Sequence, residues 1–165
     1  MASTLEQTHQ IKLTLVDSAN RIIDSKDYDI TYQMFSLPDD SDVMHQSFYQ
    51  NSAFLKINYF IISVLDGSLV FRLDDMPLAQ KFLSEYDNNF MVLPELDDIT
   101  ILEALHRKFS VIAGANTFVC RVSLTDQLTK VTYHLDFDPE DNVLHSLPTA
   151  DEWLGELSFW EKAWW

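Results

Sequence analysis

The chain has 165 residues, of which 47% are hydrophobic, and 26 acidic residues against 11 basic ones give it a formal net charge of −15. This hydrophobic share is that of ordinary globular proteins, so we expect one folded domain over residues 1–165 rather than a disordered chain. The strong acidity disfavours direct binding to nucleic acid, because contacts to phosphates need clustered Lys and Arg side chains.

The sequence also limits where the protein is expected to work. Cys120 is the only cysteine, which excludes an internal disulfide. No apolar run reaches the roughly 18 residues that a membrane-spanning helix needs, and the first residues have neither the basic nor the apolar part of a signal peptide. We therefore expect a cytoplasmic protein that does not bind membranes, and we expect residues 1–8 to be disordered.

A hairpin and a helix are predicted near the start of the chain. Residues 11–17 place hydrophobic side chains at every second position, and residues 22–34 repeat this alternation after a turn that Ser18–Asn20 favour. Residues 41–52 follow several possible N-cap residues, and this order predicts a helix.

A second hairpin is predicted directly after this helix. Residues 53–65 are apolar on both faces, which is typical of a central strand that is covered on both sides. Asp66 and Gly67 favour a type I′ turn, since that turn needs two residues with positive φ, and residues 68–73 would form the returning strand. Two strands, a helix and two further strands would make the first half of the chain β-grasp-like.

Two helices are predicted in the middle of the chain. The first begins at Asp74-Asp75-Met76-Pro77, where acidic residues and a proline suit a helix N-terminus. After a loop over 87–96, the second begins at Asp97-Asp98-Ile99-Thr100. Thr100 and Glu103 have the spacing of a capping box, and Gly114 is a natural helix stop. The hydrophobic stripe of this helix is Ile99, Leu102, Leu105, Phe109 and Ile112.

The last third should contain a third hairpin and a final helix. Residues 117–124 and 129–137 alternate, and a loop at Asp126-Gln127 would place Val122 opposite Val131 and Cys120 opposite Tyr133. Cys120 would then be a buried, unreactive thiol. Residues 150–162 are predicted to be helical. The fold class is therefore α+β, with a mostly antiparallel sheet of three hairpins and about four helices.

No catalytic signature is present. The chain has no glycine-rich phosphate loop and no nucleophile elbow, and its five histidines and one cysteine lack the spacing of metal ligands. Residues 136–142 begin like a calcium loop, but Asp141 and Leu147 stand where such a loop requires glycine and a bidentate glutamate. We expect no metal, no cofactor and no enzymatic activity; an enzyme whose catalytic residues are scattered along the sequence is the alternative.

The acidic residues concentrate in predicted turns and at predicted helix starts. Capping alone explains such positions, but acids that gather on one side would form a negatively charged surface. In size, acidity and lack of motifs the chain is similar to immunity proteins of nuclease toxins and to phage-type DNA-mimic inhibitors such as anti-CRISPR and anti-restriction proteins. We therefore expect binding to a basic protein partner. The acidic positions predicted to bind it are Asp39, Asp40, Asp42, Asp74, Asp75, Asp97, Asp98, Asp138, Glu140 and Asp141.

All four tryptophans lie in the last thirteen residues. In a helix over 150–165, Trp153, Trp160 and Trp164 would share one stripe with Leu157, which could close the core. Trp164 and Trp165 could instead anchor a partner, because tryptophan is enriched among binding hot spots. This reading supports an alternative function: a non-catalytic assembly or scaffolding subunit, a homodimer for example, held together by its aromatic C-terminus.

Overall fold

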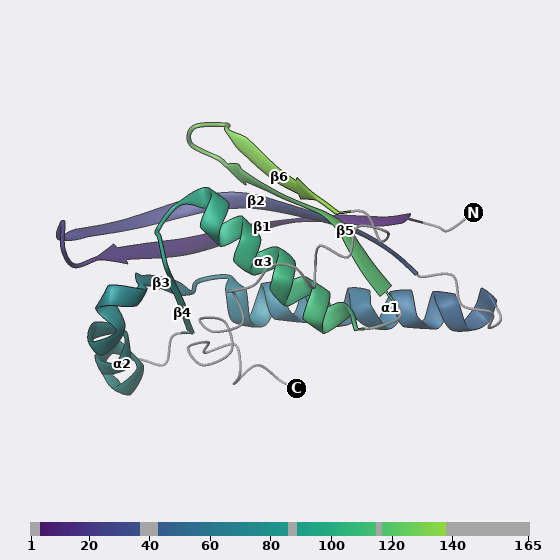
Figure 1. Ribbon diagram of the computed structural model, residues 1–165, viewed down its shortest axis with the longest axis horizontal. Coiled ribbons are helices and arrows are strands. Elements are labelled where there is room, and N and C mark those ends of the chain that lie inside the picture. The colour runs from purple at the N-terminus through teal and green to yellow at the C-terminus, as the bar shows by residue number, and fades with distance from the viewer. Residues whose placement is uncertain (1–3, 37–42, 86–88, 115–116, 138–165) are drawn as a thin grey trace.

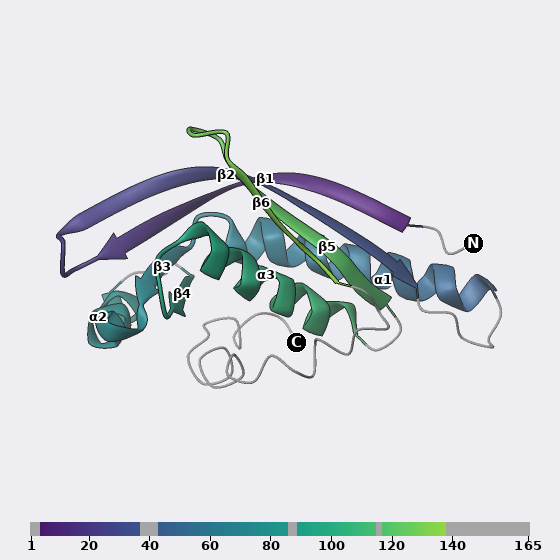
Figure 2. The same ribbon diagram turned by 45° about the horizontal axis from the view of Figure 1, so that its top comes forward.

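The computed structural model describes residues 4–36, 43–85, 89–114 and 117–137. Its elements are β1 (Thr4–Asp17), β2 (Ile22–Ser36), α1 (Val43–Phe60), the π-helix η1 (Ile61–Leu65), β3 (Leu69–Arg72), the 3₁₀-helix η2 (Leu73–Asp75), α2 (Met76–Glu85), β4 (Phe90–Leu93), α3 (Asp98–Ala113), β5 (Thr117–Asp126) and β6 (Thr132–Asp136). The strands form one mixed six-stranded sheet in the order β4-β3-β1-β2-β5-β6. The helices lie on one side of this curved sheet, with α1 and α3 next to each other (Figures 1 and 2).

The β1–β2 hairpin is the longest unit of the sheet. Its strands pair antiparallel from Thr4 opposite Phe35 to Asp17 opposite Ile22. The Asp17 side chain closes the turn by accepting hydrogen bonds from the backbone N–H groups of Ala19 and Asn20. The predicted hairpin is confirmed, but β1 begins at Thr4, so the expectation of disorder over residues 1–8 is wrong for residues 4–8.

The second predicted hairpin is wrong. Residues 53–65, expected to be a strand, continue the predicted helix as the end of α1 and all of η1. Their hydrophobic residues on both faces fit a doubly covered strand, but a short apolar run of this kind does not distinguish strand from helix. In the structure one face packs on the sheet through Ala53, Ile57 and Phe60, while the opposite face stays exposed.

Asp66 and Gly67 do form a turn, but of another type. Asp66 has φ −63° and ψ 127°, Gly67 has φ 81°, and the Ser68 N–H donates to the Leu65 carbonyl at 3.1 Å. These values define a type II turn, which needs positive φ at only one position. The turn leads from a helix into β3, which pairs parallel with β1 and with β4. The β-grasp-like arrangement is therefore wrong, and β4 lies inside the predicted loop 87–96.

The two middle helices are confirmed. α2 follows η2 at Met76, and α3 begins after Asp97 and ends before Gly114, whose φ is 79°. The predicted capping box is wrong, because the cap is Asp97 itself: its carboxylate accepts the Thr100 N–H at 2.7 Å. Four of the five predicted stripe residues are buried, while Ile99 in the first turn is exposed.

The β5–β6 hairpin is confirmed with a different register. Val122 lies opposite Leu135 rather than Val131, and Leu124 lies opposite Tyr133. The shift is an even number of residues, so Val122 and Leu124 stay on the buried face, whereas Val131 and Tyr133 are exposed. A bulge between Gln33 and Met34 shifts the register of β5 against β2, and Cys120 next to it is half-buried rather than buried.

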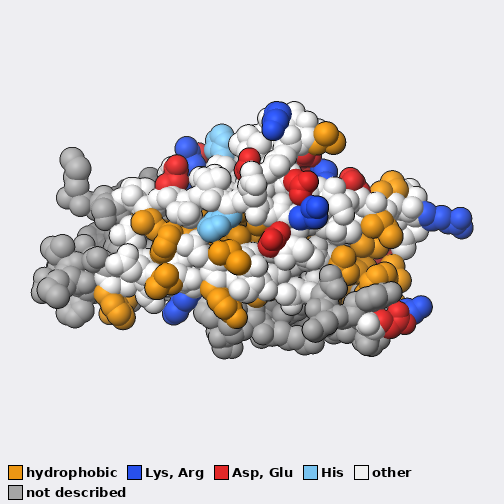
Figure 3. All heavy atoms as spheres, turned by 180° about the vertical axis from the view of Figure 1, so that it is seen from behind, with side chains coloured by type: hydrophobic (Ala, Val, Ile, Leu, Met, Phe, Trp, Pro, Cys, Tyr) orange, Lys and Arg blue, Asp and Glu red, His pale blue; other side chains and the backbone are white. Residues whose placement is uncertain are grey.

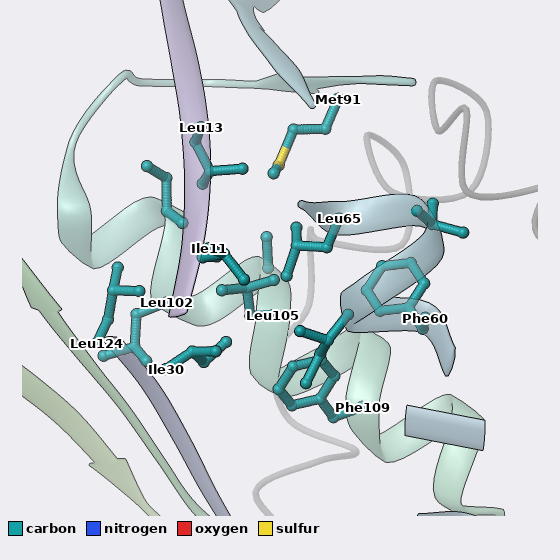
Figure 4. Close-up of a cluster of buried hydrophobic side chains, with 14 of the residues drawn as sticks. Ile11, Leu13, Ile30, Phe60, Leu65, Met91, Leu102, Leu105, Phe109 and Leu124 are labelled. Atoms are coloured by element: carbon teal, nitrogen blue, oxygen red, sulfur yellow. The ribbon is translucent and has the colours of Figure 1, made fainter. Parts of the chain in front are cut away.

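The core fills the space between the sheet and α1 with α3, as Figure 4 shows. Phe109 of α3 is central: its ring meets Tyr32 of β2 with centroids 5.6 Å apart and Phe60 of α1 at 6.2 Å, both edge to face. Each of these three aromatic side chains is fully buried.

Candidate functional site

Four of the predicted partner-binding residues lie in the described part of the chain. Asp75 accepts hydrogen bonds from the N–H and hydroxyl of Ser18, and Asp97 caps α3. Asp74 is exposed, while Asp98 is partly buried and pairs with Lys26. The other predicted residues, Asp39, Asp40, Asp42, Asp138, Glu140, Asp141, Trp164 and Trp165, lie outside the described residues, as does the predicted helix 150–162.

Lys26 of β2 forms the centre of a charged cluster. Its Nζ atom lies 3.3 Å from Oδ1 of Asp98 and 3.2 Å from Oδ2 of Asp126. The Tyr28 hydroxyl donates to the same oxygen of Asp98 at 2.7 Å. The side chains of Lys26, Asp98 and Asp126 are 26%, 15% and 4% exposed. The cluster therefore ties the start of α3 and the end of β5 to β2.

Three of these groups, Lys26, Asp126 and Tyr28, are held in their usual charge states. Burial lowers the pKa of Lys26, but the two carboxylates outweigh it and leave that pKa above its ordinary value. Burial raises the pKa of Asp126, yet the Leu128 N–H and Lys26 outweigh it, and the pKa is lowered. Burial, followed by the bond to Asp98, raises the pKa of Tyr28. Lys26, Asp126 and Tyr28 thus do not titrate near neutral pH, which does not suit general acid–base catalysis.

Two open hollows flank Lys26. One has a volume of about 370 Å³ and lies between the β1–β2 and β5–β6 hairpins; it is lined by Asp24, Ser25, Lys26, Asp27, Asp126, Gln127 and Leu128. The other has a volume of about 310 Å³ and lies at the start of α3; it is lined by Lys26, Leu96, Asp97, Asp98, Ile99 and Tyr133. Carboxylates line both hollows, on either side of one lysine.

We define the acidic surface as the six carboxylates that these hollows and their neighbours bring together. Asp29 joins the set because its Oδ1 accepts the Gln127 side-chain N–H at 2.9 Å. The cations nearby are Lys26, Lys12, whose Nζ lies 3.9 Å from Asp27, and Lys130 in the turn after Asp126. The acidic surface consists of Asp24, Asp27, Asp29, Asp97, Asp98 and Asp126.

Only two of these six residues, Asp97 and Asp98, were among the predicted positions. The prediction favoured acids in turns and at helix starts, whereas Asp24, Asp27 and Asp29 lie within a strand. The stretch from Asp24 to Asp29 carries three aspartates in six residues. This local density is the signal that could have identified the site.

A second polar cluster has a structural role. Asn58 of α1 accepts the Tyr32 hydroxyl at 2.7 Å, and its Oδ1 also lies 2.7 Å from Nε2 of His9. The His9 and Tyr32 rings stack with centroids 6.5 Å apart. These contacts fix α1 against β1 and β2.

His106 of α3 is fully buried. Its Nε2 lies 3.1 Å from the Val119 carbonyl, its ring stacks on Phe137 with centroids 3.8 Å apart, and Nδ1 has no hydrogen-bond partner among the described residues. Burial lowers its pKa to about 4, so the ring is neutral at pH 7. The neighbouring cavity of about 90 Å³ is small and is lined by Glu103, His106, Arg107, Leu135 and Phe137.

Within the described ranges, no three His, Cys, Asp or Glu side chains are placed to hold a metal ion. Asp136, the first residue of the calcium-like stretch, instead pairs with Arg121, whose Nη2 lies 3.2 Å from Oδ2. None of the helices in the described part of the chain has the length and apolar character to cross a membrane.

Comparison with known proteins assigns no family. No family model matches the sequence, and no curated protein matches it significantly. Among solved structures, an uncharacterized protein from Wolinella succinogenes is similar with a TM-score of 0.46 and 14% identity, over 84% of this chain and 99% of that one. A catalytic-residue mutant of 6-pyruvoyltetrahydropterin synthase from Plasmodium vivax is similar with a TM-score of 0.40 and 9% identity, over 83% of this chain and 99% of that one. Likeness at this level assigns no activity to the chain.

Proposed function

We propose that this protein binds a basic protein partner through the acidic surface and thereby inhibits it. The partner would be a nuclease toxin, for which the chain is the immunity protein, or a DNA-binding defence protein, for which it is a DNA mimic. The observation that carries the proposal is the convergence of five carboxylates from β2, β5 and the start of α3 around two hollows, with Asp29 bonded to Gln127 beside them.

The carboxylates of the acidic surface have two different roles in the proposed binding. Asp98 and Asp126 are engaged by Lys26 and hold the surface in shape. Asp24 and Asp27 are exposed beside one hollow, and Asp97 lines the other. A Lys or Arg side chain of the partner would enter a hollow and meet these outward groups. Opposite charges of this kind accelerate association and lose their effect at high salt.

The test uses a matched pair of double variants. Asp24→Asn with Asp97→Asn removes one charge from each hollow, and Asn at position 97 can still cap α3. The control, Glu6→Gln with Glu85→Gln, removes two exposed charges outside the acidic surface. Glu6 lies nine strand residues from the position opposite Asp24, or roughly 30 Å away.

The partner is first captured from the native host at low salt, identified and purified. Its Kd is then measured against each variant at about 50 and about 500 mM salt, a change that shortens the screening length roughly threefold. We expect the acidic-surface variant to bind about two- to tenfold more weakly than the control, and with a flatter salt dependence. Binding that ignores salt, or that weakens equally in both variants, would refute the proposal.

The two kinds of partner are separated by a second measurement on the same complex. An immunity protein would block the nuclease activity of the partner. A DNA mimic would compete with DNA, so added duplex DNA would displace the protein from a DNA-binding partner.

A further inference from the structure

α1 and η1 expose a row of hydrophobic side chains on the face turned away from the sheet. Phe48, Leu55 and Ile62 are 66%, 66% and 64% exposed, and Tyr59 is 52% exposed. Figure 3 shows hydrophobic side chains over the part of the molecule where α1 lies, and a second group of them at the opposite end. The row lies on α1 and η1, whereas the acidic surface is formed by β2, β5 and the start of α3, so the two are separate features.

The spacing of this row is that of a helix-packing seam. Phe48, Leu55 and Ile62 are seven residues apart, and Ser52 and Tyr59 fall between them, which gives steps of four, three, four and three. Steps of four and three keep side chains in one line along an α-helix and let them interlock with a second helix; this holds for the four positions in α1, and the row ends at Ile62 in the π-helix η1. The seam therefore fits a helical partner better than a flat surface or a small ligand.

The charge of this region points to a second copy of the chain. Residues 43–65 contain no Asp or Glu and a single Lys, Lys56, although the whole chain has 26 acidic residues and a net charge of −15. Two such chains repel each other wherever their acids meet. The seam is a place where two copies can approach without bringing carboxylates together.

The seam is also symmetric about its middle. Phe48 and Ile62 lie seven residues before and after Leu55. In an antiparallel pair, Leu55 meets the same residue of the other copy, and Phe48 meets Ile62. Such a two-fold contact uses the same patch on both chains, the commonest arrangement of homodimers. We propose that the protein forms a homodimer through antiparallel packing of α1 and η1 against the same segment of a second copy.

The exposed area is sufficient for this contact. Four side chains that are half to two-thirds exposed offer on the order of 500 Å² of mainly apolar surface. This area is at the upper end for apolar patches on monomeric proteins. It is also most of the ~800 Å² that each partner buries in a standard protein–protein interface. The dimer does not use the acidic surface, which β2, β5 and the start of α3 provide. Dimerisation can therefore be tested independently of the proposed partner.

Light scattering with size-exclusion chromatography tests the dimer on the full chain. We expect twice the chain mass of 19.2 kDa at micromolar concentrations and a single chain mass for Leu55→Glu. The matched control is Val111→Glu, which places the same charge on an exposed apolar position of α3 and should leave the dimer intact. A monomeric wild-type chain overturns the proposal.

Cysteine crosslinking tests the orientation without destabilising charges. In a Cys120→Ser background, Leu55→Cys should form a disulfide-linked dimer on mild oxidation, since a disulfide needs Cα atoms within about 7 Å. Phe48→Cys should not, because an antiparallel pair separates the two copies of residue 48 by about 20 Å along the helix axis. Crosslinking of both variants, or of neither, contradicts the antiparallel pair.

Discussion

Replacing Lys26 with Met removes the cation of the charged cluster and keeps the apolar part of the side chain. Lys26 is mostly buried, and its Nζ lies 5.5 Å from the centroid of the Tyr28 ring, so the methionine can occupy much of the same space. The carboxylates of Asp98 and Asp126 are then left without their shared cation. An unpaired carboxylate of low exposure is costly, because neither water nor a counter-charge stabilises it.

The loss of stability expected for Lys26→Met lies between the values typical of exposed and of buried ion pairs. Removing one member of an exposed ion pair changes stability by about 0–1 kcal/mol, while removing one member of a fully buried pair costs about 3–5 kcal/mol. Lys26 retains 26% exposure and Asp126 only 4%, so we expect a loss of about 1–3 kcal/mol in the free energy of unfolding at pH 7. For a chain of this length that is a decrease in Tm of about 2–12 °C.

The pH dependence follows from the directions of the two pKa shifts. The pKa of Asp126 is lowered from 3.8, so its contribution is present above that pH and is lost as the pH falls through the folded-state pKa. The pKa of Lys26 is raised from 10.5, so its contribution is lost as the pH rises through the folded-state value. The deficit of Lys26→Met should therefore be largest between about pH 5 and pH 10 and should shrink in acid.

Chemical denaturation at pH 7 and at several acidic pH values measures this deficit. Lys12→Met is the control, because Lys12 is exposed and lies 3.9 Å from the exposed Asp27, a pair that should contribute little. Equal stability of the two variants at pH 7, or a deficit of Lys26→Met that does not shrink in acid, would refute this account of the cluster.

Two further predictions concern α3. Asp97→Ala removes the acceptor for the Thr100 N–H and should reduce the free energy of unfolding by about 1 kcal/mol, whereas Asp97→Asn should be nearly neutral in the same denaturation assay. His106 has a pKa lowered from 6.5 to about 4, so the unfolded chain binds its proton first and the wild-type protein loses stability as the pH falls through that window. His106→Gln should lack this part of the acid destabilisation, and parallel Tm-against-pH curves for the two proteins would contradict the buried neutral histidine.

The elements that the sequence predicted correctly carry strong local signals. The β1–β2 hairpin alternates over both strands, and α3 combines a capping aspartate, a hydrophobic stripe and a glycine at its end. Each signal is local, since it depends on neighbours within a few residues. β4 was missed because its four residues, Phe90–Leu93, are all buried and show no alternation, although β4 is an edge strand that pairs only with β3.

The grouping of the acidic-surface residues could not be predicted from short stretches of the sequence. Asp97 and Asp98 were identified from their place before a helix, but their neighbours Asp24 and Asp126 come from two different strands. Only the pairing of β2 with β5, with Tyr28 opposite Asp126, brings these positions together. Pairing between strands distant in sequence is a property of the whole fold, and no single stretch of residues specifies it.

The error over residues 53–65 and the inferred dimer have the same physical origin. Hydrophobic residues on both faces predicted a strand because a buried strand has neighbours on both sides. The segment is instead helical, and the sheet covers only the side with Ile57 and Phe60. A helix that is hydrophobic on all sides is stable in water when the side that faces away from the sheet is covered as well. The face with Leu55 therefore needs a covering surface, and the absence of acidic residues over 43–65 makes a second copy of this acidic chain a suitable one.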